Sequence, residues 1–359
     1  MNEYFVTWWN VENLFAVEDD PERHPWLQRY LGRELAGWTE EVLAMKLNQL
    51  SSVVTRMNEG RGPDLLGVCE VENASVLQLL VEAIQLPHRK YEVVHHNSGD
   101  KRGIDVAFIY DSNRLRMNSN EVFHHIIQKR TATRDLLQVN FYTKPHNNLL
   151  ICIGNHWPSR LGGVLQSEPY RMLAGETLSY WMTRIHEIYA MRAYEDGLVE
   201  SLSKAVPPPV LVMGDFNDEP FNRALTEYAL AERIERKVRS RRSKKPYLLN
   251  LMWPLMGSGH MTHVYGGAPN MIDQFLVNRG MLDADGPIKL ARIAMAGKKV
   301  PYVGIVKFAD MVMKSGSGKG GPRRFGRPAK HYDSEGFSDH FPIAIKLLEA
   351  GDSPGNNWA

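Results

Sequence analysis

The chain has 359 residues, which is enough to bury a large core in one large domain or two ordinary ones. Hydrophobic residues make up 43% of the sequence, an ordinary share for a soluble globular protein. The formal net charge is only +2, which excludes a polycation, so any attraction to a polyanion must come from local basic clusters.

The cysteines and the N-terminus bear on the cellular compartment. Cys69 and Cys152 are the two cysteines, and both lie in apolar runs. We therefore expect buried free thiols rather than a disulfide framework or a cysteine metal site. No basic region with a long apolar run begins the chain, and no segment approaches the length of a membrane-spanning helix. These features predict a soluble cytoplasmic protein with no membrane association and no evident obligate protein partner.

Short apolar runs alternate with longer helical patterns along the chain. Runs rich in Val, Ile, Leu, Phe and Tyr are typical of strands. The predicted strands are 4–9, 64–69, 91–95, 104–110, 136–142, 149–154, 210–213, 272–277 and 341–347. Apolar residues recur at helical spacing over 43–57, after the capping residue Thr39, and over 76–84, after Asn73. Two helices are predicted there.

A longer helix is predicted to begin near Ser167, with Pro169 in its first turn, where proline is tolerated. Its apolar stripe comprises Ala174, Leu178, Trp181, Ile185 and Ile188. A stripe of this kind is more often part of the core than of a functional site.

Three stretches are predicted to be loops, namely 18–38, 236–246 and 314–336. No internal repeat and no clear linker divides the chain. Residues 1–350 are therefore predicted to form a single domain with basic loop insertions near 236–246 and 314–336, followed by a flexible tail at 351–359.

Polar side chains follow several of the predicted strands, at the point where each strand ends. Such positions project side chains from a rigid scaffold into a shared cleft. Six segments share this pattern: 7–15, 65–73, 151–160, 210–218, 271–277 and 337–342. Taken singly, each could be a turn, a cap, an ion pair or a satisfied core residue. Together they offer carboxylate and amide oxygens, two histidines and no cysteine, which are ligands that suit Mg²⁺ or Mn²⁺ rather than zinc.

The ordered set resembles the endonuclease/exonuclease/phosphatase superfamily. The Gly-Asp-x-Asn element at 214–217 and the Ser-Asp-His element at 338–340 carry most of the resemblance, together with Asn10 and Glu70. The run at 155–160 looks most like the uncharacterised bacterial branch. The resemblance implies an α/β protein with a four-layer α/β/β/α sandwich, in which two packed β-sheets are flanked by helices and the site lies at one edge.

A metal site is implied by the resemblance. Glu70 looks like the main ligand, with Asn10 and Asp339 beside it. Asp215 and Asn217 match residues that orient or activate the attacking water, and they could hold a second metal ion. The implied cofactor is Mg²⁺ or Mn²⁺.

The resemblance also implies a set of phosphate contacts. His340 matches the histidine that contacts the scissile phosphate, and Asp273 matches the carboxylate that orients it. His156 matches a second phosphate-contacting histidine, and the neighbouring Asn155 is expected to bind substrate. The family often has tyrosine after the aspartate, and Gln274 stands there in this chain, so one wall of the site is expected to differ.

Basic residues near these segments are candidates for holding a polyanion. Arg160 and Arg171 follow His156, Arg102 precedes a predicted strand, and arginine grips phosphate with two donors at once. The stretch before the Ser-Asp-His element contains Lys314, Lys319, Arg323, Arg324, Arg327 and Lys330. The run at 236–245 could extend that surface. Structural ion pairs and solvated loops remain the alternatives for all of them.

The predicted function is that of a divalent-metal-dependent phosphodiesterase, a nuclease that hydrolyses DNA or RNA by metal-assisted attack of water. One alternative is a phosphatase for inositol phosphates or other small phosphomonoesters, which would use the same cations as a compact pocket. Another is a catalytically inactive phosphate-binding module. Degenerate ligands would mark such a module, but all the matching positions are chemically competent.

Overall fold

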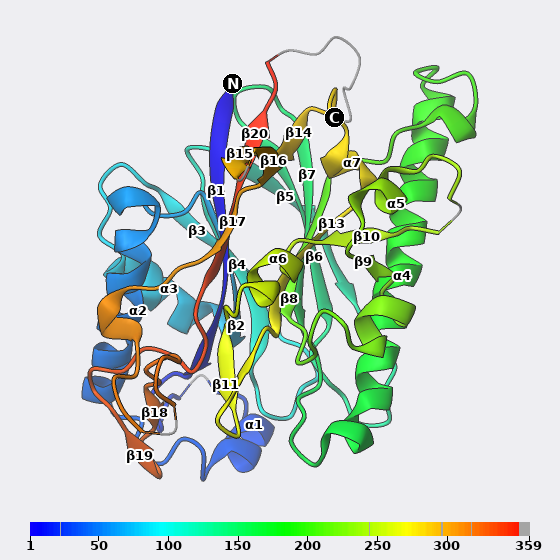
Figure 1. The fold of residues 1–359 in the computed structure, drawn as a ribbon. Coiled ribbons are helices and arrows are strands. Elements are labelled where there is room, and N and C mark those ends of the chain that lie inside the picture. Colours follow the sequence, from blue (N-terminus) through cyan, green and yellow to red (C-terminus); the bar gives the residue numbers. More distant parts are fainter. Residues whose placement is uncertain (22, 244, 296, 317, 352–359) are drawn as a thin grey trace.

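The computed structural model describes residues 1–351 except 22, 244, 296 and 317. Two seven-stranded sheets pack face to face, and helices cover both outer faces (Figure 1). The first sheet contains β1 (Asn2–Leu14), β2 (Leu65–Val71), β3 (Tyr91–His95), β4 (Asp105–Asp111), β14 (Ile288–Leu290), β17 (Val303–Ile305) and β20 (Ile343–Glu349). Its order is β14-β20-β1-β2-β4-β3, with β17 also paired to β20.

The second sheet has the order β5-β6-β7-β8-β13-β10-β9. Its strands are β5 (Leu115–His125), β6 (Leu136–Thr143), β7 (Leu149–His156), β8 (Val210–Asp215), β9 (Ala231–Glu232), β10 (Leu248–Asn250) and β13 (Asp273–Val277). Three small hairpins lie outside the sheets: β11 (His263–Tyr265) with β12 (Ala268–Asn270), β15 (Arg292–Met295) with β16 (Lys298–Pro301), and β18 (Gly326–Arg327) with β19 (His331–Tyr332).

Helices complete the outer layers. They are α1 (Pro25–Leu31), α2 (Glu40–Gly60), α3 (Ala74–Ala83), α4 (Val164–Glu195), α5 (Glu235–Arg239), α6 (Trp253–Gly257) and α7 (Arg279–Leu282), with short helical turns η1 (Leu202–Lys204), η2 (Ala224–Tyr228) and η3 (Ala309–Met311). The predicted four-layer sandwich is confirmed, because α2 and α3 cover the first sheet and α4 covers the second (Figure 1).

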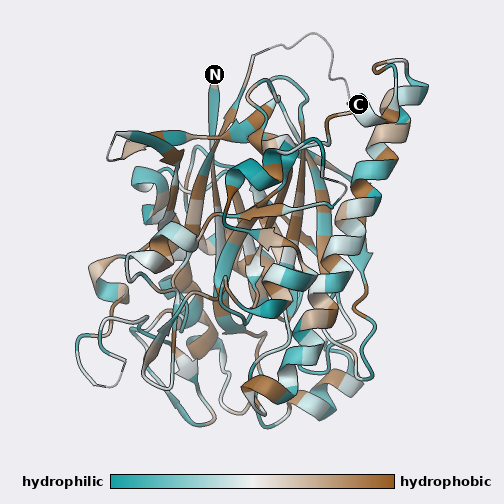
Figure 2. Ribbon diagram, turned by 45° about the vertical axis from the view of Figure 1, so that its right-hand side comes forward, coloured by the Kyte–Doolittle hydropathy of each residue, from teal (hydrophilic) through white to brown (hydrophobic). Residues whose placement is uncertain are grey.

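Apolar side chains fill each space between the layers. The middle layer, between the two sheets, contains the fully buried Trp8, Phe108, Phe141 and Phe275. Separate clusters lie under α2 and α3 and under α4. Figure 2 shows this as hydrophobic central strands beneath helices that carry many hydrophilic residues. A rigid two-sheet core of this kind holds the strand ends in fixed positions.

All nine predicted strands overlap strands of the two sheets. Both predicted helix caps are confirmed as well: the Thr39 hydroxyl accepts a hydrogen bond from the Val42 N–H, and the Asn73 side chain accepts one from the Val76 N–H. The edge strand β5 was not predicted, because its exposed face is polar and the alternation is weak. Both cysteines are buried and free, as expected.

The predicted start of the long helix was wrong by about one turn. α4 begins at Val164, after the positive-φ glycines Gly162 and Gly163, so Pro169 lies inside the helix rather than in its first turn. Ile188 is 53% exposed, and Tyr189 is buried in its place. The predicted stripe from Ala174 to Ile188 follows a strict seven-residue repeat, which drifts around a straight helix and accounts for this error.

The predicted loops contain short elements. Residues 18–38 include α1, residues 236–246 begin with α5, and residues 314–336 include the β18–β19 hairpin. Lys244 and the predicted tail from residue 352 onward lie outside the described residues. In the part of the chain that the structure describes, no helix is long and apolar enough to span a bilayer.

His186, a residue of α4, gives the fold an expected acid sensitivity. His186 accepts a hydrogen bond from Asn278 at 3.2 Å, and burial, followed by the nearby Arg279, lowers its pKa to about 4. Between pH 6.5 and pH 4, His186 binds a proton in the unfolded chain but stays neutral in the native state. The free energy of unfolding is therefore expected to fall by about 2 to 3 kcal/mol between pH 6.5 and pH 4.

Urea unfolding of His186→Gln across this pH range measures the effect. The acid-side slope should flatten relative to the wild type, whereas the exposed His260→Gln control should keep it. Parallel curves for His186→Gln and the wild type would contradict the assignment.

Candidate active site

The polar ends of the predicted strands converge on one cleft at the edge of the sandwich. β1 runs parallel to β2, and β7 runs parallel to β8, so their carboxyl ends meet. In this register, Asn10 is paired with Cys69, and Asp215 is paired with both His156 and Asp273. The cleft has a volume of about 330 Å³. Its lining includes Glu70, Arg102, His156, Arg160, Asp215, Asn217, His263, Arg324, Arg327, Asp339 and His340.

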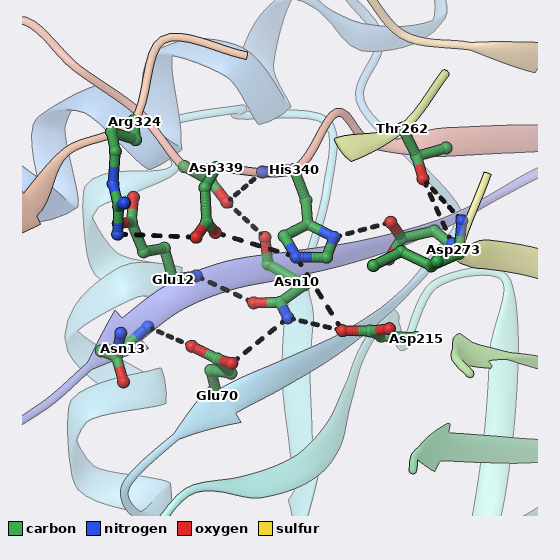
Figure 3. Close-up of polar contacts among 12 residues, drawn as sticks. Asn10, Glu12, Asn13, Glu70, Asp215, Thr262, Asp273, Arg324, Asp339 and His340 are labelled. Atoms are coloured by element: carbon green, nitrogen blue, oxygen red, sulfur yellow. Dashed lines mark hydrogen bonds and ion pairs between the residues drawn. The ribbon is translucent and has the colours of Figure 1, made fainter. Parts of the chain in front are cut away.

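A histidine–aspartate pair forms one side of the cleft (Figure 3). His340 Nδ1 lies 2.7 Å from Asp273 Oδ2, and the Trp8 indole donates to Asp273 Oδ1 at 3.2 Å. Burial alone would lower the pKa of His340, but Asp273 and two further carboxylates outweigh it and hold the pKa well above its usual range. The pair therefore presents a protonated imidazole whose Nε2–H faces the cleft.

Two carboxylates and an amide lie opposite this pair (Figure 3). Asn10 Nδ2 donates to Asp215 Oδ2 at 3.1 Å and to Glu70 Oε1 at 3.4 Å. Asp215 Oδ1 accepts the Asn217 N–H at 2.9 Å. Burial, with a further contribution from Asp273, raises the pKa of Asp215 to about 7, although the charge of the neighbouring histidine opposes the rise.

The backbone is strained at these acidic segments. Glu70 has a φ of 67°, and Asn217 has a φ of 51°, in the left-handed region that residues other than glycine rarely adopt. At Glu70 this conformation accompanies a shift of register at the end of β2, and its Oε2 accepts the Asn13 N–H at 3.0 Å. Strain of this kind persists only where the surroundings fix it, and it is concentrated at functional sites.

Close packing of β7 on β8 brings the second histidine into the cleft. A Cβ at Gly214 would lie 2.5 Å from the Cβ of Asn155, so only glycine fits before Asp215. His156 Nε2 then lies 3.7 Å from Glu70 Oε1 and 3.8 Å from Asp215 Oδ2. Burial, together with nearby arginines, lowers the pKa of His156 well below its usual range. His156 is therefore neutral, unlike His340.

Asp339 lies on the other side of His340, between two sets of cations. Its Oδ1 is 3.8 Å from His340 Nε2, and its Oδ2 is 3.6 Å from Arg324. Burial would raise the pKa of Asp339, but these partners and His263 hold it below its usual value. Arg324 is itself held by the buried Glu12, which also accepts the N–H groups of residues 325 and 326.

The donor set suits a hard divalent cation. Carboxylate oxygens of Glu70 and Asp215 approach the same Asn10 nitrogen, and burial raises the pKa of Asp215, a penalty that a bound cation would offset. Among the described residues, two groups have ligand atoms that all lie within 4.8 Å of one another: His263, Asp339 and His340; and Asp215, Asp273 and His340. Glu70 is connected to the second group through Asn10.

The arginines predicted to hold phosphate fall into two groups. Arg102 and Arg160 line the cleft, and Arg160 also donates to the Asn217 carbonyl oxygen at 2.7 Å. Arg171 does not reach the cleft: its side chain is 1% exposed and its Nε lies 2.8 Å from Asp218 Oδ1. Arg171 is thus a structural ion pair, which was the alternative considered for it.

Asn155 and Gln274 are also internal. Asn155 is fully buried, donates to the Ile153 carbonyl oxygen and accepts the Trp157 indole N–H. Gln274 is fully buried and donates to the Asp218 carbonyl oxygen at 2.6 Å. Asn155 is therefore not brought into the cleft with the other predicted residues, and Gln274 supports its wall from behind.

The two basic stretches differ in position. Arg324 and Arg327 of the 314–336 stretch reach the cleft, although both are paired with glutamates, Glu12 and Glu34 respectively. Residues 236–243 of the other stretch lie toward the opposite end of the second sheet, near α7 (Figure 1). That run therefore does not extend the cleft.

Sequence reasoning missed two contributors from the segment before β13. His263 lines the cleft, and its ring centroid lies 4.6 Å from that of His340. The Thr262 hydroxyl accepts the Asp273 N–H at 3.2 Å and so fixes the start of β13 (Figure 3). The β11–β12 hairpin, which begins at His263, is too short to give a periodic signal in the sequence. The two histidines His260 and His263 in an otherwise unremarkable loop were the available clue.

Comparisons with known proteins agree with this geometry. A family model described as Endonuclease/Exonuclease/phosphatase family matches residues 5–349, nearly the whole chain. No curated protein sequence matches the chain.

Solved structures share the fold at low sequence identity. An endonuclease/exonuclease/phosphatase family protein from Bacteroides thetaiotaomicron has a TM-score of 0.50 and 14% identity, covering 97% of this chain and 98% of that one. TDP2 from D. rerio, complexed with a single-strand DNA product, has a TM-score of 0.52 and 12% identity, covering 97% and 100%. TDP2 from Caenorhabditis elegans has a TM-score of 0.50 and 14% identity, covering 97% and 75%. At this identity the likeness shows the fold alone.

Proposed function

Because the chain belongs to the endonuclease/exonuclease/phosphatase family, a family of phosphate ester hydrolases that generally depend on a divalent metal ion, we propose that it is a nuclease that hydrolyses phosphodiester bonds of DNA or RNA. The observation that carries the proposal is that a proton donor and a pair of carboxylates face each other across one cleft. The His340–Asp273 pair supplies a proton donor on one side, and Glu70 and Asp215 supply carboxylates on the other.

In this proposal the histidine pair acts on the phosphate. The His340 Nε2–H donates to a non-bridging oxygen as negative charge develops there. Asp273 fixes the imidazole tautomer and favours its charged form, and the Trp8 indole holds the second carboxylate oxygen. His156, which is neutral, contributes a second hydrogen bond to the phosphate.

Asp215 acts as the base in the same scheme. Asp215 lines the cleft with its carboxylate, where it can accept a proton from the attacking water. Asn217 holds Asp215 through its backbone N–H, and Arg160 holds Asn217 through its carbonyl oxygen. These contacts aim the carboxylate and orient the water.

Glu70, Asn10, Asp339, Asp215 and Asn217 are the proposed holders of Mg²⁺ or Mn²⁺. When bound, the ion would neutralise charge on the phosphate oxygens and on the leaving oxygen. Oxygen ligands without a thiolate favour these ions over zinc.

Cations around the cleft favour a nucleic acid as substrate. The cleft is lined by Arg102, Arg160, Arg324 and Arg327. The sugar-phosphate backbone of a nucleic acid can contact such a set of arginines with successive phosphates. The scaffold of the D. rerio TDP2 complex holds a single-strand DNA product, so a chain of this kind fits the fold. A phosphatase for small phosphomonoesters is the competing outcome of the experiment below.

Metal removal is expected to abolish hydrolysis. Purified protein would be incubated with supercoiled plasmid, linear duplex, single-stranded DNA and RNA, in Mg²⁺ or Mn²⁺. EDTA should lower cutting to background, and added metal should restore it, because the ion supplies charge stabilisation worth several kcal/mol. Cutting that persists in EDTA would contradict the metal requirement. Phosphate release from inositol phosphates or nucleotides, with no nucleic acid cut, would replace the nuclease by the phosphatase.

A further inference from the structure

A second cavity adjoins the cleft. Its volume is about 610 Å³, and it shares Arg102, Ser159 and Leu161 with the cleft. Three loops and the first turns of α4 enclose it. The shared residues make the two spaces neighbours along one surface.

The second cavity has an excess of positive charge. Lys101, Arg102, Lys129 and Arg134 line it, and Asp100 is the one carboxylate among its lining residues. Asp100 is already shared, because Arg134 lies 2.8 Å from it and Arg102 lies 3.6 Å from it. Among the described residues, the buried Arg134 Nε has no hydrogen-bond partner. The lining thus carries four cations and one carboxylate.

The charge excess is felt by the side chains themselves. Burial, followed by Arg134 and Arg102, lowers the pKa of Lys129. Burial and Arg134 likewise lower the pKa of Arg102. An anion between these groups would relieve their mutual repulsion.

A helix end adds to the same potential. Gly162, Gln166 and Ser167 bring the N-terminus of the 32-residue α4 to the cavity wall. No side chain caps this end, since Gly163 occupies the N-cap position. The positive end of a long helix, with backbone N–H groups pointing outward, favours phosphate.

We propose that this second cavity binds another phosphate of the same substrate, next along the chain from the phosphate in the cleft. The ligand is a single-stranded polynucleotide segment, and Arg102 lies between its two phosphate positions. The inference rests on the proposed nuclease function and deepens it, because a substrate with a single phosphate has none to place there.

Lys129 offers a direct test. It lies on the far side of the cavity, with its Nζ 4.6 Å from the centre of the Tyr170 ring. The measurement is kcat/KM for a single-stranded oligonucleotide relative to kcat/KM for bis(p-nitrophenyl) phosphate, which has one phosphate. Lys129→Gln should lower this ratio about tenfold and make the salt dependence of oligonucleotide cleavage shallower by about 0.7 in log–log slope. Lys129→Arg should restore the ratio, and Lys90→Gln, at an exposed lysine directly before β3, should leave it unchanged.

Equal effects of Lys129→Gln on both substrates, or no effect on either, would overturn the proposal. Binding of a labelled oligonucleotide to His340→Ala protein separates it from the proposed function. Adding Lys129→Gln to that protein should raise Kd about tenfold. If the wild type cuts no nucleic acid but binding still depends on Lys129, the nuclease function fails and the phosphate cavity stands. If binding is unchanged by Lys129→Gln, the cavity proposal fails.

Discussion

Replacing His340 with alanine is expected to lower kcat by about a thousandfold or more while leaving KM within a few-fold. The imidazole is buried and is charged by its contact with Asp273. The other two histidines of the cleft, His156 and His263, cannot replace it as a charged donor, because burial lowers their pKa values. Its hydrogen bond strengthens as charge develops on the phosphate, so the loss is expected in kcat. Steady-state cleavage of the preferred substrate in saturating Mg²⁺ measures it.

Asp273→Asn separates orientation from chemistry. The asparagine keeps the shape but cannot stabilise the imidazolium, so kcat should fall by about a hundredfold or more. His88→Ala, at an exposed turn, is the matched control and should retain full activity.

A His340→Ala enzyme with more than about a tenth of the wild-type rate would remove His340 from the reaction.

Asp215→Asn is expected to lower kcat by about a thousandfold and, in metal-free protein, to raise Tm. The variant loses the base and a proposed metal ligand, which accounts for the rate. The gain in stability follows from the raised pKa of Asp215, about 7. Above its unfolded value of 3.8 the ionised form costs the native state free energy, a cost present at neutral pH and absent at low pH.

Thermal unfolding at pH 8 and pH 4 in EDTA tests the second half of this expectation. The Tm difference between Asp215→Asn and the wild type should be positive at pH 8 and should shrink at pH 4. Asp285→Asn, on an exposed turn, should show neither effect. A variant that cuts at full rate would eliminate Asp215 as the base, whatever its stability.

The strands and the main site residues were accessible from the sequence because their signals are local. Each apolar run that is followed directly by polar residues predicted the end of a strand, and this located the ends of β1, β2, β7 and β8. In the structure, the parallel pairing of β1 with β2 and of β7 with β8 brings these ends together. The four-layer arrangement came from the family resemblance alone. Strand and helix alternation is compatible with it but would also fit other folds.

The fate of individual cations could not be predicted, because it depends on partners that are distant in sequence. Arg324 meets Glu12 across 312 positions, and Arg171 is withdrawn into the core by Asp218. His263 reaches the site through an isolated bridge with His340 that no periodic pattern announces. The sequence therefore shows how many basic residues a stretch such as 314–330 contains. Only the fold shows which of them are paired with carboxylates.

The strand order determines when the cleft becomes complete during synthesis of the chain. β1 lies between β2 and β20, and Glu12 at its end ties down the segment around Arg324. Asn10 leaves the ribosome 330 positions before His340, and translation proceeds at about 5 to 20 residues per second. A nascent chain thus lacks Asp339 and His340 of the cleft until late in this interval. Because these two residues directly precede β20, the proposed active site is complete only after that strand has docked beside β1.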